Sequence, residues 1–185
     1  MAVVDAVVRQ GLTTWSIDPA HSHVEFAVRH LMISTVKGRF TDVGGVVRSD
    51  DADPAQGEVD ITIGVASIDT REAQRDAHLR SADFFDAETF PAITFKSRRL
   101  ENVKGDGFKI VGDLTMRGVT RPVVLDVTSE GRGKDPWGGE RAGFSATTKI
   151  KRSVFGLTWN QLLETGGVAV GDDVKISIDV ELVKK

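Results

Sequence analysis

The four histidines are the side chains of this sequence that are best suited to coordination chemistry. His21 and His23 stand two positions apart, which on a strand places both imidazoles on one face, and His30 and His78 could complete a set of ligands. No acidic residue stands at a clear ligand spacing from these histidines, and a single His-X-His pair is a weak signal. We therefore expect no metal, and a His-dependent metal enzyme is the less favoured alternative.

Motifs for covalent and nucleotide chemistry are absent from the sequence. It contains no Gly-X-Ser-X-Gly elbow, no P-loop, no dinucleotide fingerprint and no His-Glu-X-X-His. It also contains no cysteine, which excludes a thiolate nucleophile, a disulfide framework and cysteine-based metal sites. The paired carboxylates Asp50/Asp51 and Asp83/Asp86 are typical of turns and caps. We expect that the protein is not an enzyme.

Apolar and polar residues alternate along almost the whole sequence. The strands that this alternation predicts would have to position any binding or catalytic side chain. Strands with this alternation have one apolar face and one polar face. We expect eight strands, at 13–31 (with a break at Asp18-Pro19), 35–48, 57–65, 92–101, 106–117, 121–131, 141–151 and 172–183. Eight antiparallel strands favour closure, so the predicted fold class is an all-β, eight-stranded antiparallel barrel with a short capping helix.

One set of alternating positions should face the barrel interior. These residues are Phe26, Val28, Phe40, Ile61, Ile63, Phe95, Phe108, Ile110, Leu114, Met116, Phe144, Ile150, Ile176 and Ile178. Gly38 and Gly112 fall on the same face and should leave space near the wall. His30 also falls on it, either as a ligand contact or as a core histidine bonded to a backbone carbonyl or to Asp18. Periodicity alone favours a solid core over a cavity.

Two segments interrupt the alternation. The first, 70–80, predicts a helix capped by Asp69 or Thr70, whose thin apolar side would cover an opening or an edge. The adjacent aromatics Phe84 and Phe85 follow it and could plug one end of a barrel. The second, 160–165, predicts a single helical turn that ends at Gly166-Gly167.

Bulk properties limit the partners. The chain has 185 residues, of which 40% are hydrophobic, and this indicates one ordered domain at 13–185 after a flexible leader at 1–12. The net charge is −3 and bases are interleaved with acids, so no nucleic-acid partner is expected. The leader has no basic start and no long apolar core, which predicts a cytoplasmic protein without stable membrane insertion. A secreted or periplasmic protein whose signal has been removed is the alternative.

Local motifs at 18–22, 26–30, 38–40, 67–70, 75–79, 81–86, 90–95, 112–122 and 152–157 resemble the YceI-like family of polyisoprenoid-binding proteins. The most specific are SADFFD at 81–86, FPAITF at 90–95 and GDLTMRGVTRP at 112–122. The resemblance implies a lipocalin-like barrel that encloses a long apolar tunnel, and it reverses the preference for a solid core. It also implies a homodimer. The chain has no tyrosine, so a hydroxyl that a relative supplies from this residue is missing.

The resemblance implies a ligand such as a polyisoprenoid or an isoprenoid quinone, and no other cofactor. Burying one isoprene unit could contribute roughly 3–4 kcal/mol, so the tail should dominate the affinity. We expect the tunnel to be lined by Phe26, Val28, His30, Phe40, Phe84, Phe85, Ile93, Phe95, Leu114, Met116 and Phe155. Candidates for contact with the head group are Arg29, His30, Arg71, Arg75, His78 and Arg152. The hypothesis is a lipid carrier for transport, storage or sequestration, and the alternative is a solid-core barrel that acts as a protein-interaction module.

Overall fold

The computed structural model describes residues 11–185, so the expected leader at 1–12 lies, except for its last two positions, outside the described residues. The strands are β1 Thr13–Ile17, β2 His23–His30, β3 Ser34–Phe40, β4 Val43–Ser49, β5 Glu58–Gly64, β6 Ile68–Asp69, β7 Ala92–Lys104, β8 Gly107–Met116, β9 Val119–Lys134, β10 Glu140–Lys151 and β11 Val170–Lys184. One α-helix, α1 Ala73–Arg80, and four short 3-10 helices, η1 Pro19–His21, η2 Pro54–Gln56, η3 Val65–Ser67 and η4 Arg152–Phe155, complete the elements of the described residues. No helix of this part is long and apolar enough to cross a membrane.

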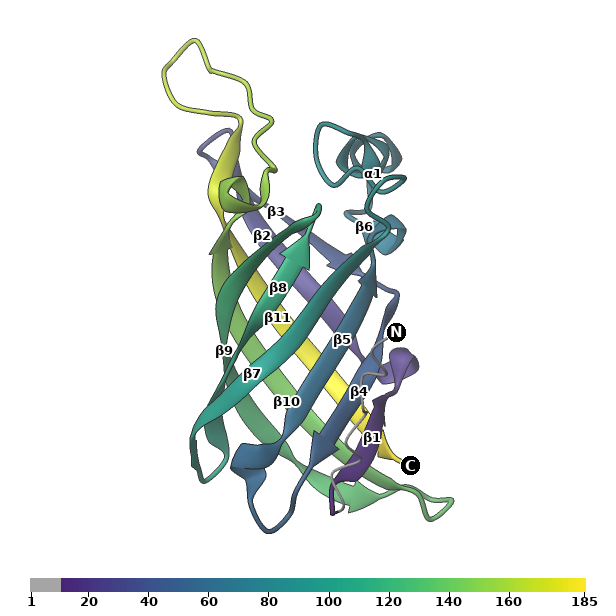
Figure 1. The fold of residues 1–185 in the computed structure, drawn as a ribbon. Coiled ribbons are helices and arrows are strands. Elements are labelled where there is room, and N and C mark those ends of the chain that lie inside the picture. The colour runs from purple at the N-terminus through teal and green to yellow at the C-terminus, as the bar shows by residue number, and fades with distance from the viewer. Residues whose placement is uncertain (1–10) are drawn as a thin grey trace, which may run out of the picture.

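The strands form one antiparallel sheet that closes on itself (Figure 1). Neighbours follow the order β1-β4-β5-β7-β8-β9-β10-β11-β2-β3-β6, and β1 also pairs with β11. β1 and β2 lie one after the other along β11, while β4 and β3 pair with β1 and β2 respectively. β5 and β6 likewise pair with β4 and β3 respectively, so each of the pairs β1/β2, β3/β4 and β5/β6 acts as one interrupted strand. The barrel therefore has eight strands, which confirms the predicted fold class.

The interruption between β1 and β2 has a local cause in the sequence. Pro19 lacks the N–H that a ladder requires, and the carboxylate of Asp18 accepts a hydrogen bond from the Ala20 N–H at 3.0 Å. The chain therefore forms η1 for three residues before it rejoins the sheet at His23. The predicted break at this dipeptide is confirmed.

The α1 end of the barrel is closed by packed aromatic rings. The ring centroids of Phe26 and Phe40 are 5.7 Å apart, and Phe85 meets Phe40 edge to face at 5.8 Å. Phe84 is 5% exposed and packs against Trp159 at 5.3 Å. We call these four phenylalanines, with the buried Ile93, Met116 and Phe155, the aromatic plug. The predicted role of Phe84 and Phe85 as a closure is consistent with this packing.

The helix at this end begins later than the sequence predicts. The side chain of Glu72, rather than Asp69 or Thr70, caps α1 by accepting hydrogen bonds from the N–H groups of Gln74 and Arg75. Thr70 instead donates its hydroxyl and its N–H to the buried carboxylate of Asp76. Asp69, Thr70 and Glu72 each carry a side-chain oxygen that could cap the helix. Only the folded chain decides which of these residues accepts hydrogen bonds from the unpaired N–H groups of the first turn.

The two glycines on the inner face do not leave open space, so that prediction is wrong. A Cβ atom added at Gly112 would lie 2.4 Å from Cζ of Phe95, and one added at Gly38 would lie 2.4 Å from Cζ of Phe26. The phenyl rings already occupy the volume that a side chain would take. These glycines therefore allow large aromatic rings to lie against the sheet.

Two loop predictions also need correction. The segment 160–165 forms no helical turn; Leu162 bridges Val168 across a turn in which Gly166 and Gly167 have φ values of 83° and 94°. The strand predicted at 121–131 is longer than expected, because β9 continues to Lys134 and β10 begins at Glu140, which leaves only residues 135–139 as the turn. In both cases pairing across the hairpin overrides the local propensity.

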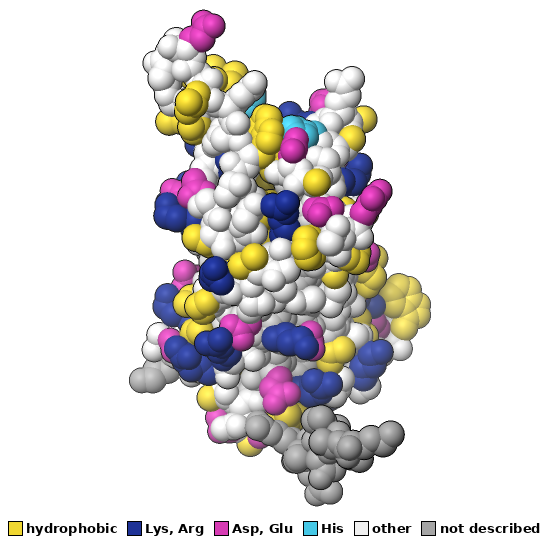
Figure 2. All heavy atoms as spheres, turned by 45° about the horizontal axis from the view of Figure 1, so that its top comes forward, with side chains coloured by type: hydrophobic (Ala, Val, Ile, Leu, Met, Phe, Trp, Pro, Cys, Tyr) yellow, Lys and Arg dark blue, Asp and Glu magenta, His cyan; other side chains and the backbone are white. Residues whose placement is uncertain are grey.

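Charged side chains alternate in sign over the outer surface of the barrel (Figure 2). Lys149 and Lys151 both pair with Asp173, and Lys109 pairs with Asp126 at 2.7 Å. These pairs are exposed to solvent, so each contributes little to stability. Their main consequence is a well-solvated exterior. An apolar ligand is therefore better accommodated by the interior of the barrel.

Candidate ligand-binding cavity

The barrel encloses an apolar cavity of about 390 Å³ in the half that lies away from α1. Its walls are Trp15, Ile17, Val24, Val43, Val47, Val59, Ile61, Ile63, Phe95, Leu100, Phe108, Ile110, Leu114, Val123, Leu125, Val127, Ala142, Phe144, Ala146, Ile176, Ile178, Val180 and Leu182. A water molecule occupies about 30 Å³ of liquid, so this space far exceeds the small voids of a well-packed interior. The cavity belongs to the class of concave, mostly apolar sites that bind small molecules.

The few polar groups in the cavity wall are already satisfied. The hydroxyl of Thr148 donates to the backbone carbonyl of Val124 at 2.9 Å, and the hydroxyl of Ser145 donates to Glu130 at 2.6 Å. The wall therefore presents hydrocarbon to whatever fills it. Only an apolar ligand gains free energy from such a surface.

The cavity reaches the end of the barrel formed by the β4–β5 loop, the β7–β8 turn and the last residues of β9. We call this the rim; it consists of Arg48, Ser49, Asp50, Asp51, Pro54, Gly57, Glu58, Val103, Gly105 and Arg132. Charged side chains are concentrated there, in contrast to the apolar walls. An amphipathic ligand would therefore place its tail inside and its head group at the rim.

The residues predicted to line a tunnel fall into two groups. Phe95 and Leu114 contribute to the wall of the cavity. Phe26, Phe40, Phe84, Phe85, Ile93, Met116 and Phe155 form the aromatic plug instead, and Val28 lies beside it on β2. The alternation correctly identified the inner face but could not show that one half of the barrel is filled and the other half is hollow.

His30 does not point into the interior. It is the last residue of β2 and is exposed to solvent, because the strand leaves the barrel wall at this point for the turn to β3. The prediction of an inward imidazole is therefore wrong. The alternation continues to the end of a strand, but burial ends where the neighbouring elements end.

The arginines predicted to meet a head group lie at the α1 end, away from the rim. Arg29 donates to the Met32 carbonyl and to the Thr35 hydroxyl, and Arg71 is exposed in the turn before α1. Arg75 donates to the hydroxyl and to the carbonyl of Thr70. These contacts fix local loops, and none of these side chains contributes to the cavity wall.

Arg152 and His78 also lie at the α1 end, where they contact other parts of the protein. Arg152 is 7% exposed, and its guanidinium donates to the backbone carbonyls of Gly171, Leu157, Trp159 and Val170 at 2.6–3.2 Å. His78 bonds to Asp83 at 2.8 Å and packs against the ring of Trp159. Burial lowers the pKa of Arg152. Four of its five N–H donors are committed to backbone carbonyls in a buried position, so its role here is structural.

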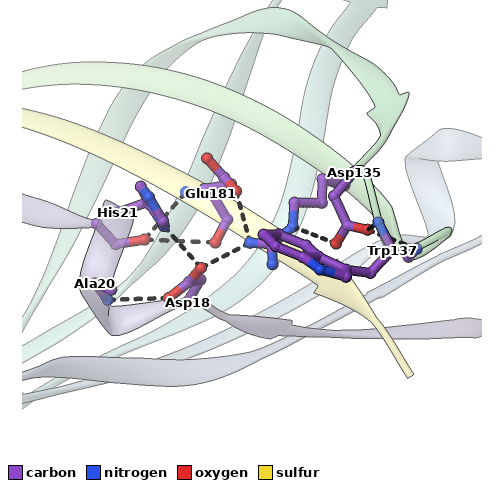
Figure 3. Close-up of polar contacts among 9 residues, drawn as sticks. Asp18, Ala20, His21, Asp135, Trp137 and Glu181 are labelled. Atoms are coloured by element: carbon purple, nitrogen blue, oxygen red, sulfur yellow. Dashed lines mark hydrogen bonds and ion pairs between the residues drawn. The ribbon is translucent and has the colours of Figure 1, made fainter.

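The histidines do not gather into a metal site in the part of the chain that the structure describes. His21 lies in η1, so it does not share a strand face with His23, whose ring faces Asp179 at 3.3 Å. Three potential ligands, Asp18, His21 and Glu181, do approach within 4.8 Å of one another (Figure 3). A guanidinium already occupies this group, because Nη1 of Arg141 lies 2.7 Å from both carboxylates.

This ion network fixes the break between β1 and β2. Arg141 also bonds to Asp135 at 3.0 Å, so one guanidinium joins η1, β11 and the β9–β10 turn. Hydrogen bonds from His21 and Arg141 lower the pKa of Asp18 to about 2. The same hydrogen bond from His21 to Asp18, together with the charge of Glu181, raises the pKa of His21.

The network predicts a pH dependence of stability with two limits. The pKa of Asp18 is lowered, so its contribution is present above about pH 4 and is lost as the pH falls toward 2. The pKa of His21 is raised, so its contribution is complete below about pH 6.5 and is lost as the pH rises through the raised value. Urea unfolding of the wild type and of His21→Gln should give midpoints that differ most at pH 5–6 and converge toward pH 9. A constant difference over this range would contradict the assignment.

Sequence reasoning missed most of the rim. Arg132 and Asp51 are 81 positions apart in the sequence, yet their side chains meet at 3.0 Å. The only local signal for Arg132 was a continued strand, in which Arg132 alternates with Gly131 and Gly133. A bulge between Gly143 and Phe144 shifts the register of β10 against β9 there, and nothing in the sequence indicates this bulge.

Comparisons with known proteins agree with this architecture. A family model described as a YceI-like domain matches residues 15–182. A UPF0312 protein of Serratia proteamaculans is 43% identical over 164 residues, which cover 89% of this chain and 82% of that protein. The crystal structure of BcnA from Burkholderia cenocepacia matches with a TM-score of 0.78 and 28% identity, over 89% of this chain and 98% of that one.

A polyisoprenoid binding domain from Saccharophagus degradans has the same fold, with a TM-score of 0.65 and 16% identity over 94% of this chain and 99% of that one. The match to the family model covers β1 to β11 and includes the residues of the cavity wall. The resemblance of the local motifs is thereby confirmed over the whole barrel. The chain belongs to the YceI-like domain family.

Proposed function

We propose that this protein binds an isoprenoid or another long apolar lipid inside its barrel and acts as a carrier for transport, storage or sequestration. The observation that carries the proposal is the apolar cavity of about 390 Å³, whose polar wall groups are bonded elsewhere. The polyisoprenoid binding domain with the same fold supports this class of ligand. An isoprenoid quinone belongs to the same class.

The volume of the cavity indicates the length of tail that it can hold. A cavity of 150 Å³ lined by aliphatic and aromatic side chains holds a benzene molecule, so 390 Å³ should hold roughly 15 carbon atoms. That is about three isoprene units. Burying them would contribute on the order of 12 kcal/mol before the loss of ligand freedom is subtracted. A longer tail would extend through the rim or displace the aromatic plug.

The two alternatives lose their main support. A solid-core interaction module requires inward side chains that fill the barrel, and they fill only the half next to α1. A His-dependent metal enzyme requires histidines that converge on one point, and among the described residues they are separated. The guanidinium of Arg141 lies between Asp18 and Glu181, the two carboxylates next to His21. A non-enzymatic carrier is the function that the geometry supports best.

Lipid retention is the direct test. Native mass spectrometry of the protein purified from cells should show a mass increment that disappears when the protein is denatured. The uncharged probe N-phenyl-1-naphthylamine should become fluorescent with the lipid-free protein, and farnesol should displace it with micromolar or tighter affinity. A clean lipid-free mass together with no fluorescence enhancement would contradict the proposal. The same native spectra would show whether the expected homodimer forms.

A further inference from the structure

Arg132 stands where a lipid head group would emerge from the cavity. It lies near the end of β9 at the rim, and its side chain is 47% exposed. The carbon of its guanidinium lies 4.9 Å from the ring centroid of Trp15, which is itself 3% exposed and bonded through Nε1 to Ser49. A fixed aromatic surface therefore supports the guanidinium at the boundary between apolar wall and solvent.

Two carboxylates hold Arg132 in this position. Asp51 accepts a hydrogen bond from Nη1 at 3.0 Å, and Glu140 lies 3.8 Å from Nη2. Glu140 belongs to β10 and also pairs with Lys184 at 3.1 Å. Asp51 belongs to the β4–β5 loop, and its side chain is 63% exposed. Of the two, Asp51 is the one that can leave without disturbing the barrel.

The other acids of this loop have different tasks. Asp50 accepts a hydrogen bond from the N–H of Ala52 and Asp53 accepts one from the N–H of Ala55, so both shape the loop backbone. Arg48, the second basic residue of the rim, faces Glu58 at 3.9 Å. Within the described residues, Asp51 is therefore the loop acid that is paired with Arg132.

An exchange of anions at Arg132 is energetically easy. The ion pair with Asp51 is exposed, and pairs of this kind contribute little to stability. A head group whose tail already fills the cavity reaches Arg132 at a high effective concentration. The planar guanidinium matches a phosphate or a carboxylate, to which it can donate two parallel hydrogen bonds instead of one.

We propose that Arg132 anchors the anionic head group, a phosphate or a carboxylate, of the lipid whose tail fills the cavity, and that Asp51 occupies this position until the ligand binds. This inference rests on the proposed function, since it requires a tail in the cavity. It places the polar end of the site at the rim, whereas the side chains that the sequence suggested for this role lie at the α1 end.

Three probes with the same C15 tail test the proposal: farnesol, farnesyl phosphate and farnesoic acid, each titrated against N-phenyl-1-naphthylamine. At least one anion should bind the wild type about tenfold or more tightly than farnesol does, and the stronger one identifies the head group. Arg132→Gln should abolish this preference while farnesol binding stays within about twofold. Asp51→Asn should tighten anion binding about threefold without a change for farnesol. Arg98→Gln, which removes an exposed arginine paired with Asp113 on the outer surface, is the matched control.

The outcomes separate the two proposals. Equal affinity of all three probes for the wild type, or an anion preference that survives Arg132→Gln, overturns the anchor but leaves the carrier function intact. Failure of all three probes to displace the dye overturns the carrier function and the anchor with it. The Asp51→Asn arm guards against a folding defect in the arginine variant, because a gain in affinity cannot arise from unfolding.

Discussion

Replacing Ala146 with phenylalanine is expected to weaken binding of a C15 isoprenoid by about three to four orders of magnitude. Ala146 is buried on β10 and contributes to the cavity wall. A phenyl ring needs roughly 150 Å³, so it would leave room for about nine of the 15 carbon atoms. The six displaced carbons correspond to about 5 kcal/mol of lost burial. Titration of the dye-loaded protein with farnesol measures the change.

The neighbouring residue provides the control for this variant. Thr147 lies on the same strand, but its side chain is exposed on the outer face. Thr147→Phe adds the same ring outside the barrel and should leave the affinity for farnesol within about twofold. Both variants should keep a cooperative thermal transition. Unchanged affinity of a folded Ala146→Phe protein would show that the lipid does not occupy this cavity.

The strands could be predicted closely because their signal is local. The side chains of a strand alternate with period two, and one buried face forces this period onto the sequence. The break at Asp18-Pro19 was also visible, since proline acts through its own backbone. The helix cap was not predictable to the residue, because Asp69, Thr70 and Glu72 could each supply the oxygen.

The hollow half of the barrel could not be predicted in this way. Phe40 in the aromatic plug and Phe95 in the cavity wall have the same residue type and the same orientation. Their difference lies in what faces them across the barrel. Phe40 meets the rings of Phe26 and Phe85, while the ring of Phe95 lies back against Gly112 and leaves the axis open. Such pairings join residues that are far apart in the sequence.

The polar residues were misplaced for a related reason. Arginine is the natural partner of a phosphate, but it is equally suited to bind several backbone carbonyls at once, because it has five donors. Nothing in the sequence around Arg152 separates these two uses. In the structure its carbonyl partners are residues 157 and 159, in the irregular segment after η4, and residues 170 and 171, at the start of β11 where the pairing with β2 is shifted. Only the fold reveals that this arginine is structural.

The structural role of Arg152 leads to the second large effect, a loss of about 3–5 kcal/mol of unfolding free energy in Arg152→Met. Methionine keeps an unbranched apolar stem but removes the guanidinium donors. The carbonyls of Gly171, Leu157 and Trp159 lose this partner, while that of Val170 still accepts from Nδ2 of Asn160. A buried acceptor left without a partner costs about 1–3 kcal/mol, and here several are lost together. The midpoint of thermal unfolding should fall by about 10 °C. Differential scanning calorimetry measures both quantities.

A head-group role for Arg152 makes the opposite prediction, and this separates the two interpretations. If Arg152 met the ligand, Arg152→Met would lower the affinity for farnesyl phosphate and leave the unfolding of the lipid-free protein almost unchanged. Arg121→Met serves as the control, because Arg121 is exposed and donates only to the adjacent Thr120 carbonyl among the bonds of the described residues. It should change stability by less than about 0.5 kcal/mol. The cavity lies in the half of the barrel away from α1. Arg152→Met that is kept folded at low temperature should therefore bind the lipid with the same affinity as the wild type.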